Sequence, residues 1–164
     1  MSKLELLIIH CTATPEGRPV SKADIVKWHT SSVQDGGRGW KQVGYSDMIH
    51  LNGLLENLVP YNENDEVEKW EITNGAVGTN AKARHIVYVG GTDKNGKAKD
   101  TRTLEQVNTL KQYVLRLIEL HPRVKIAGHN QFSKKDCPSF HVPSWLRSLG
   151  VSEVNIYKAE PLIL

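Results

Sequence analysis

Apolar and polar positions along the chain form short blocks that predict strands and helices in turn. The apolar run over residues 4–9 indicates a buried strand, which delivers His10 at its carboxyl end. Ser21 and Asp24 then have the spacing of a capping box, so we predict a helix that runs through about residue 30. The chain therefore opens with a strand followed by a helix.

The next stretch is glycine-rich over residues 34–39, which predicts a loop. Residues 43–50 then alternate between apolar and polar side chains, as expected for a strand, and a turn leads into a second strand over 54–59. Residues 60–82 are the least regular part of the sequence, and we expect surface loops there.

The second half repeats the alternation of strand and helix. Residues 85–89 predict a strand, residues 124–127 a shorter one, and residues 143–149 a last helix. The clearest helix starts at Thr103, whose cap pairs with Gln106, and its apolar stripe contains Val107, Leu110, Val114, Leu117 and Ile118. This order of elements predicts one α/β domain over residues 1–152, with a mixed central sheet flanked by helices, followed by a C-terminal tail over 153–164.

Composition narrows the functional classes. The chain has 164 residues and a net charge of +3, and its basic side chains are scattered among 18 acidic ones, so we expect no nucleic-acid partner. The apolar run near the N-terminus is too short for a signal peptide, and no later stretch approaches a membrane span. We therefore expect a protein made in the cytoplasm without a signal peptide and without membrane insertion.

Three side chains suggest a metal site. His10 and His129 both stand at the ends of predicted strands, and Cys137 lies in a polar loop that can fold back toward His129. Three such ligands with a free fourth position are the pattern of a catalytic zinc site. However, the sequence contains seven histidines, and a buried free cysteine is often a small core residue, so the residues alone leave both interpretations open.

Four separated segments resemble one family. They are "IIHCTAT" at 8–14, "VGYSDMI" at 43–49, "VGGTDKNGK" at 89–97 and "GHNQFSKKDCPSFHV" at 128–142. In this order they resemble the zinc-dependent N-acetylmuramoyl-L-alanine amidases, in the phage-lysozyme branch whose fold is shared with peptidoglycan-recognition proteins. Agreement at several separated motifs is more specific than agreement at one.

The resemblance implies a role for each matching residue. The metal ligands would be His10, His129 and Cys137, holding one Zn²⁺ per chain, and the catalytic side chains would be Tyr45 and Lys135. The implied reaction is hydrolysis of the amide between N-acetylmuramic acid and L-alanine in peptidoglycan. We therefore expect an endolysin-like monomer of phage or prophage origin that acts on the cell wall after release, with delivery by a secretion machine as an alternative route.

The remaining histidines and the other cysteine have no motif support as ligands. We expect surface or hydrogen-bonded roles for them, and His141 is the one candidate for a competing ligand because it lies four residues after Cys137. Cys11 should point to the opposite face of the strand from His10 and pack in the core. The histidines without motif support are His29, His50, His85, His121 and His141.

The sequence departs from the family pattern just before the third motif. Val77 stands where relatives often carry a histidine, and Arg84 and His85 interrupt a strand that is usually small and apolar. We expect these changes to affect the substrate groove and not the metal. Two other functions stay open: a module that binds peptidoglycan without cutting it, which typically lacks the cysteine ligand, and a nucleic-acid or regulatory partner, which the scattered charge supports poorly.

Overall fold

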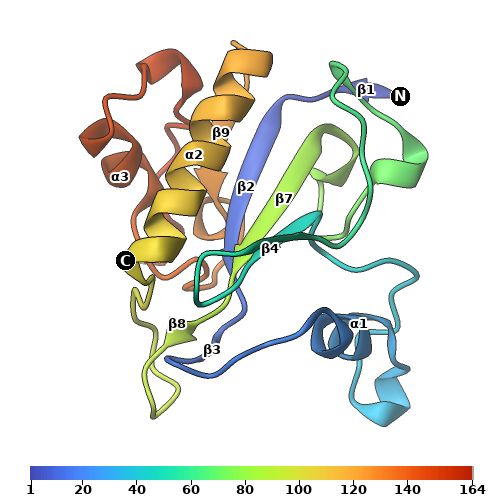
Figure 1. The fold of residues 1–164 in the computed structure, drawn as a ribbon. Coiled ribbons are helices and arrows are strands. Elements are labelled where there is room, and N and C mark those ends of the chain that lie inside the picture. Colours follow the sequence, from blue (N-terminus) through green and yellow to red (C-terminus); the bar gives the residue numbers. More distant parts are fainter. Residues whose placement is uncertain (164) are drawn as a thin grey trace.

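The computed structural model describes residues 1–163 and places a mixed β-sheet at the centre of the molecule (Figure 1). Within these residues the sheet has five strands, in the spatial order β5 (Leu55–Asn57), β4 (Asp47–Ile49), β7 (Ala83–Tyr88), β2 (Leu6–Cys11) and β9 (Lys125–Gly128). Strands β4, β7, β2 and β9 run parallel, and β5 is antiparallel to β4. The predicted α/β class and mixed sheet are confirmed.

Strand β2 lies inside the sheet, between β7 and β9. Every residue of β2 is buried, which explains why its sequence is a continuous apolar run and does not alternate. The run leads to His10, which is registered with Val87 of β7. The predicted strand is therefore confirmed, displaced by two residues at each end.

One face of the sheet is covered by α2 (Leu104–Leu120) and α3 (Val142–Ser148), which lie side by side in Figure 1. The capping box of Thr103 and Gln106 is present, and α2 ends before His121, as predicted. Leu110, Val114 and Leu117 of the predicted stripe are buried against the sheet, in one cluster with Val142 and Leu146 of α3. This cluster is the main core of the domain.

The other face carries α1 (Lys22–Thr30), which lies apart from α2 and α3 in Figure 1. Ser21 and Asp24 form the predicted capping box, in which each side chain accepts from the other residue's backbone N–H. Ile25 of α1 packs in a second apolar cluster with Met48 and Val87 of the sheet. Since Val87 is registered with His10, α1 and its loop cover the face on which His10 lies.

The predicted strand over residues 43–50 is much shorter than expected, because only Asp47–Ile49 joins the sheet as β4. The backbone N–H of Gly44 donates to Nδ1 of His29 at 2.9 Å, and not to a neighbouring strand. The donor of Gly44 is therefore satisfied by a side chain of α1, whereas the backbone N–H of Ser46, next to β4, still donates to the carbonyl of His85 in β7 at 2.8 Å.

Short elements complete the described part of the chain. β1 (Ser2–Lys3) pairs with β6 (Glu66–Val67), and β3 (Thr14–Pro15) pairs with β8 (Gly91–Thr92). The 3₁₀ turns are Val33–Asp35, Lys69–Glu71, Asn80–Lys82, His129–Gln131 and Glu153–Asn155. The region 60–82 is thus mostly loop and turn. Across residues 1–163, no helix has the length and apolar character needed to cross a membrane.

The first part of the predicted tail packs on the domain. Ile156 is fully buried and bridges to Ile126 of β9, and the side chain of Asn155 donates to the carbonyls of Pro122 and Val124. Residues 155 and 156 therefore help to hold the edge of the sheet at β9. Leu164, the last residue of the predicted tail, lies outside the described residues.

Candidate metal centre

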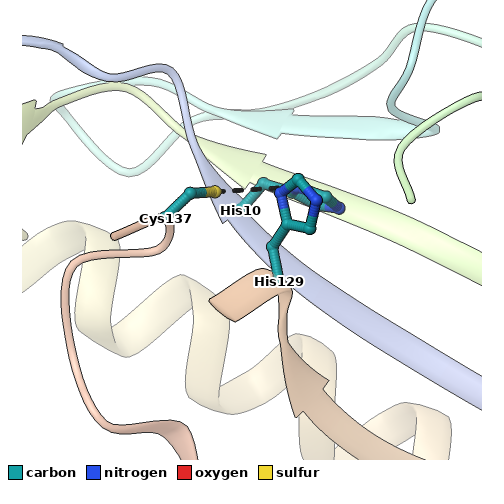
Figure 2. Close-up of side chains that lie close together, drawn as sticks. All are labelled: His10, His129 and Cys137. Atoms are coloured by element: carbon teal, nitrogen blue, oxygen red, sulfur yellow. Dashed lines mark hydrogen bonds between the residues drawn. The ribbon is translucent and has the colours of Figure 1, made fainter. Parts of the chain in front are cut away.

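His10, His129 and Cys137 converge at the carboxyl ends of two neighbouring parallel strands (Figure 2). His10 belongs to β2, and His129 directly follows β9, which pairs with β2. Cys137 arrives from the loop after the 3₁₀ turn that His129 opens. One ligand atom from each residue lies within 4.8 Å of the other two. The convergence predicted from the sequence is therefore present in the fold.

The donor set suits a metal ion. Nδ1 of His10 lies 3.7 Å from Sγ of Cys137, and a tetrahedral ion with ordinary bond lengths would hold such atoms about 3.5 Å apart. Imidazole and thiolate donors favour borderline or soft metals over calcium or magnesium. Three protein ligands leave a fourth coordination position free. The residues present therefore fit a catalytic type of metal site.

The turn after β9 holds His129 in place. The backbone N–H of Gly128 donates to Oε1 of Gln131 at 2.8 Å, and the amide of Gln131 donates to the carbonyl of Tyr157 at 2.9 Å. A Cβ at Gly128 would lie 2.8 Å from Oδ1 of Asn130 and 2.9 Å from a methyl group of Val142, so a side chain there would displace its neighbours. Backbone packing and a buried amide thus orient the turn that carries His129.

Cys137 contacts the strand that carries His10. The backbone N–H of Cys11 donates to Sγ of Cys137 at 3.3 Å. Burial raises the pKa of the Cys137 thiol, and the neighbouring thiol of Cys11 raises it further. Cys11 itself packs in the main core cluster, as predicted, but its contact with Cys137 was not foreseen. Both cysteines are free thiols.

His85 is the principal residue that sequence reasoning missed. It is fully buried, and its Nδ1 lies 2.9 Å from Nε2 of His10. The expectation that His85 would not affect the metal site is wrong, because its ring contacts the candidate ligand His10 directly. Burial lowers the pKa of His85 to about 3. The pKa of His10 is lowered well below its usual value, first by the burial of its ring and then by the neighbouring His85. Both rings are therefore neutral at neutral pH.

Arg84, the second departure from the family pattern, lies away from the metal ligands. Its guanidinium carbon lies 3.7 Å from the centre of the Tyr61 ring, and its nitrogen lies 3.9 Å from a carboxylate oxygen of Glu63. The expectation that Arg84 would affect the substrate groove has no support in these contacts. Val77, by contrast, is almost fully exposed on the loop that precedes β7.

Tyr45 and Lys135 border the same pocket as two of the ligands. The pocket has a volume of about 130 Å³, and its lining includes Tyr45, His129, Lys135 and Cys137. The Tyr45 ring centre lies 5.1 Å from that of His10, and burial raises the pKa of its phenol, so the hydroxyl stays protonated. Lys135 is exposed. The pKa of His129 is lowered to about 4, first by the burial of its ring and then by the positive charge of Lys135.

Two aromatic residues on the same pocket were not predicted. The ring centre of His29 lies 5.0 Å from that of Trp40 and 5.1 Å from that of Tyr45. The guanidinium of Arg38 lies over Trp40, 5.0 Å from its ring centre. A signal was available in the sequence, since Arg38 lies in the glycine-rich loop and Trp40 directly follows it, but the packing of Trp40 on His29 depends on the fold.

The other histidines without motif support have partners elsewhere, as predicted. His50 lies 2.9 Å from a carboxylate oxygen of Glu56, and His121 lies 3.1 Å from one of Asp65. His141 caps α3, where its Nδ1 accepts from the backbone N–H of Ser144 at 3.1 Å. His141 is therefore engaged at a helix terminus and does not join the three clustered ligands.

Known proteins resemble this chain in sequence and in fold. No protein-family model matches the chain. The endolysin of Escherichia phage T7 is 27% identical over 141 residues, which cover 86% of this chain and 84% of that protein. Among solved structures, the N-acetylmuramoyl-L-alanine amidase LysC of Clostridium intestinale superposes with a TM-score of 0.68 at 18% identity, covering 92% of this chain and 88% of LysC. Bumblebee PGRP-SA superposes with a TM-score of 0.69 at 16% identity, and the match covers 98% of this chain and 87% of PGRP-SA. The chain is therefore a relative of the phage endolysins and has the fold shared by N-acetylmuramoyl-L-alanine amidases and peptidoglycan recognition proteins.

Proposed function

We propose that this protein is a zinc-dependent N-acetylmuramoyl-L-alanine amidase, which hydrolyses the amide between N-acetylmuramic acid and L-alanine in peptidoglycan. The observation that carries the proposal is the convergence of His10, His129 and Cys137, whose ligand atoms lie within 4.8 Å of one another beside a pocket. The likeness to an endolysin and to an amidase supports the same reaction.

Zinc would be held by two imidazoles and one thiolate, and it would supply Lewis acidity toward a carbonyl oxygen and toward water. The protein must position the scissile amide next to this centre. The pocket of about 130 Å³ borders two of the three ligands, so the carbonyl of a bound amide can be placed there. One zinc ion per chain is the proposed content.

Lys135 and Tyr45 would act on the charge that develops at the amide. The ammonium of Lys135 lies at the pocket, where a cation stabilises an oxyanion. Tyr45 keeps its proton at neutral pH, so its hydroxyl can donate a hydrogen bond to the same oxygen or assist proton transfer. We propose these two side chains as the catalytic residues, and neither is proposed as a ligand.

The alternative is a module that binds peptidoglycan without cutting it. The likeness to bumblebee PGRP-SA leaves this function open, because the fold alone does not decide between recognition and hydrolysis. The thiol of Cys137 favours the enzyme, since it completes a set of three ligands. A nucleic-acid partner receives no support from the scattered charges.

The proposed partner is peptidoglycan, and the proposed site of action is the cell wall. Phage endolysins are the relatives that suggest this location. We further propose that the protein acts as a monomer, is made in the cytoplasm and reaches the wall after release.

Digestion of purified peptidoglycan tests the reaction. An amidase should release stem peptides with new L-alanine amino termini and leave the glycan strands long, which mass spectrometry of the products detects. New reducing sugar ends without free L-alanine amines would indicate a glycosidase instead. Intact wall that retains the protein would favour the binding module. The variant Cys137→Ala serves as the matched control and should release no peptides.

A further inference from the structure

His10, His85 and Asn80 form a continuous chain of hydrogen bonds that ends at the candidate metal ligand. Nε2 of His10 lies 2.9 Å from Nδ1 of His85, and Nε2 of His85 lies 3.0 Å from Oδ1 of Asn80. The same Oδ1 accepts from the backbone N–H of Ala76 at 3.0 Å. His10 and His85 are buried, so these contacts are shielded from competing water.

The backbone amide at the end of this chain determines the position of every proton in it. A backbone N–H can only donate, so the side-chain atom of Asn80 that faces Ala76 must be the oxygen. An oxygen can only accept, so Nε2 of His85 carries a proton and donates to it. A neutral imidazole has one N–H, so Nδ1 of His85 is left as an acceptor.

The proton of His10 can be placed by the same reasoning. Because Nδ1 of His85 accepts, Nε2 of His10 carries the proton of that neutral ring. The free lone pair of His10 then belongs to Nδ1, and Nδ1 is the atom that lies 3.7 Å from Sγ of Cys137. This chain of hydrogen bonds thus leaves Nδ1 of His10, the nitrogen that faces Cys137, unprotonated.

We propose that His85 and Asn80 are positioning residues, which fix the tautomer and the ring orientation of His10 so that Nδ1 faces the metal. This inference rests on the proposed metal site, but it does not depend on which bond the enzyme cuts. Outer hydrogen-bond partners of metal-bound histidines have this role generally, and their loss lowers metal affinity by roughly 10- to 100-fold.

The local packing holds the ring of His85 in one position. The ring lies against Gly75, where a Cβ would come within 2.3 Å of Nδ1 of His85, so a side chain at residue 75 would displace the ring. His85 is registered with Ile8 of β2, and His10 lies two residues further along the same strand. Residues two apart share a face of the sheet, which brings the two rings together.

The first test is the tautomer itself, measured on the metal-free protein by two-bond ¹H–¹⁵N NMR of the imidazole rings. Both His10 and His85 should carry their proton on Nε2. A proton on Nδ1 of His10 in the wild-type protein would overturn the proposal. This measurement needs neither zinc nor activity, so a protein that shows no amidase activity can still confirm or overturn the inference.

The second test is zinc affinity, measured by competition with a chromophoric chelator. His85→Phe keeps a ring against Gly75 but removes both nitrogens, and it should bind zinc roughly 10- to 100-fold more weakly. His85→Asn is the matched control, because its side-chain oxygen can accept from His10 near the position of Nδ1, and it should recover most of the affinity. Equal zinc affinity in wild type, His85→Phe and His85→Asn would contradict a positioning role.

A second variant tests the proposal if His85→Phe does not fold. Asn80→Ala removes the acceptor at the end of the hydrogen-bond chain but leaves both imidazole rings. It should therefore allow both tautomers of His10 to be populated and weaken zinc binding. Asn80→Asp keeps an acceptor and should retain the Nε2-protonated form. Zinc bound as tightly by Asn80→Ala as by wild type, with an unchanged NMR tautomer, would also contradict the proposal.

Discussion

The backbone N–H of Cys11 donates to Sγ of Cys137 at 3.3 Å, and Cys11 directly follows the candidate ligand His10 in the same strand. Strand β2 therefore contributes an imidazole to the candidate metal centre and also a hydrogen bond to the sulfur of a second candidate ligand. A donor directed at sulfur favours the thiolate form that metal binding requires. Since the donor is a backbone group, substitution of the Cys11 side chain leaves it in place.

The ligand set predicts the metal content of the purified protein. Wild-type protein should contain about one zinc per chain, and Cys137→Ala and His129→Ala should lose most of it, because each removes one of three ligands. Elemental analysis measures the content. His141→Ala is the control, since His141 caps α3 and should not affect zinc. Full zinc occupancy in Cys137→Ala would refute the assignment.

Lys135 should affect turnover without affecting the metal. Lys135→Ala removes the cation at the pocket, and we expect a loss in kcat of roughly 100-fold or more, as for removal of one oxyanion donor. Zinc content and circular dichroism should match wild type. Lys134→Ala is the matched control, because the adjacent lysine is also exposed but does not line the pocket. Similar losses in both variants would point to general surface charge instead.

Tyr45 should act through its hydroxyl. Tyr45→Phe keeps the ring beside His10 and His29 but removes the donor, so we expect kcat to fall by roughly 100-fold while the fold is retained. Steady-state kinetics on soluble muramyl peptides measures the effect. Zinc lost together with activity would mean that Tyr45 supports the metal site and does not act on the substrate.

Buried neutral histidines predict that the metal-free protein loses stability in mild acid. Burial lowers the pKa of His29 from 6.5 to about 4 and that of His85 from 6.5 to about 3. Between these values and 6.5 the unfolded state binds more protons, so the free energy of unfolding falls as pH decreases, by up to about 1.4 kcal/mol per pH unit for each histidine.

Urea unfolding at pH 7 and pH 5 measures this dependence. The midpoint should be lower at pH 5, in a range where most carboxylates are still ionised. His29→Asn can still accept from the N–H of Gly44 but cannot titrate, so its midpoint should change less between the two pH values. An unchanged midpoint in wild-type protein would show that the histidines do not govern acid stability.

Local patterns predicted the elements that depend on neighbours in sequence. The capping boxes at Ser21 and Thr103 fix the starts of α1 and α2, and the apolar run before His10 forms β2 because that strand is buried throughout. The three candidate ligands could be grouped in advance, because both histidines stand at the ends of predicted strands and the motifs resemble a known family.

The parts that the sequence did not reveal depend on register and on contacts between distant side chains. His85 reaches His10 only because β7 pairs with β2 with Ile8 opposite His85. Likewise, Gly44 of the predicted strand donates to the side chain of His29, fifteen residues earlier, and not to a neighbouring strand. Neither contact has a periodic or local signal, so only the assembled sheet and its covering helix determine them.

The two ligands joined by the 3.7 Å contact, His10 and Cys137, are separated by 127 positions in the chain. During synthesis, β2 leaves the ribosome long before β9 and the loop that carries Cys137. A nascent chain that ends before these segments lacks two of the three proposed ligands, His129 and Cys137. The proposed zinc-dependent hydrolysis therefore requires a chain translated through Cys137, and a product that terminates before this residue lacks the proposed metal centre.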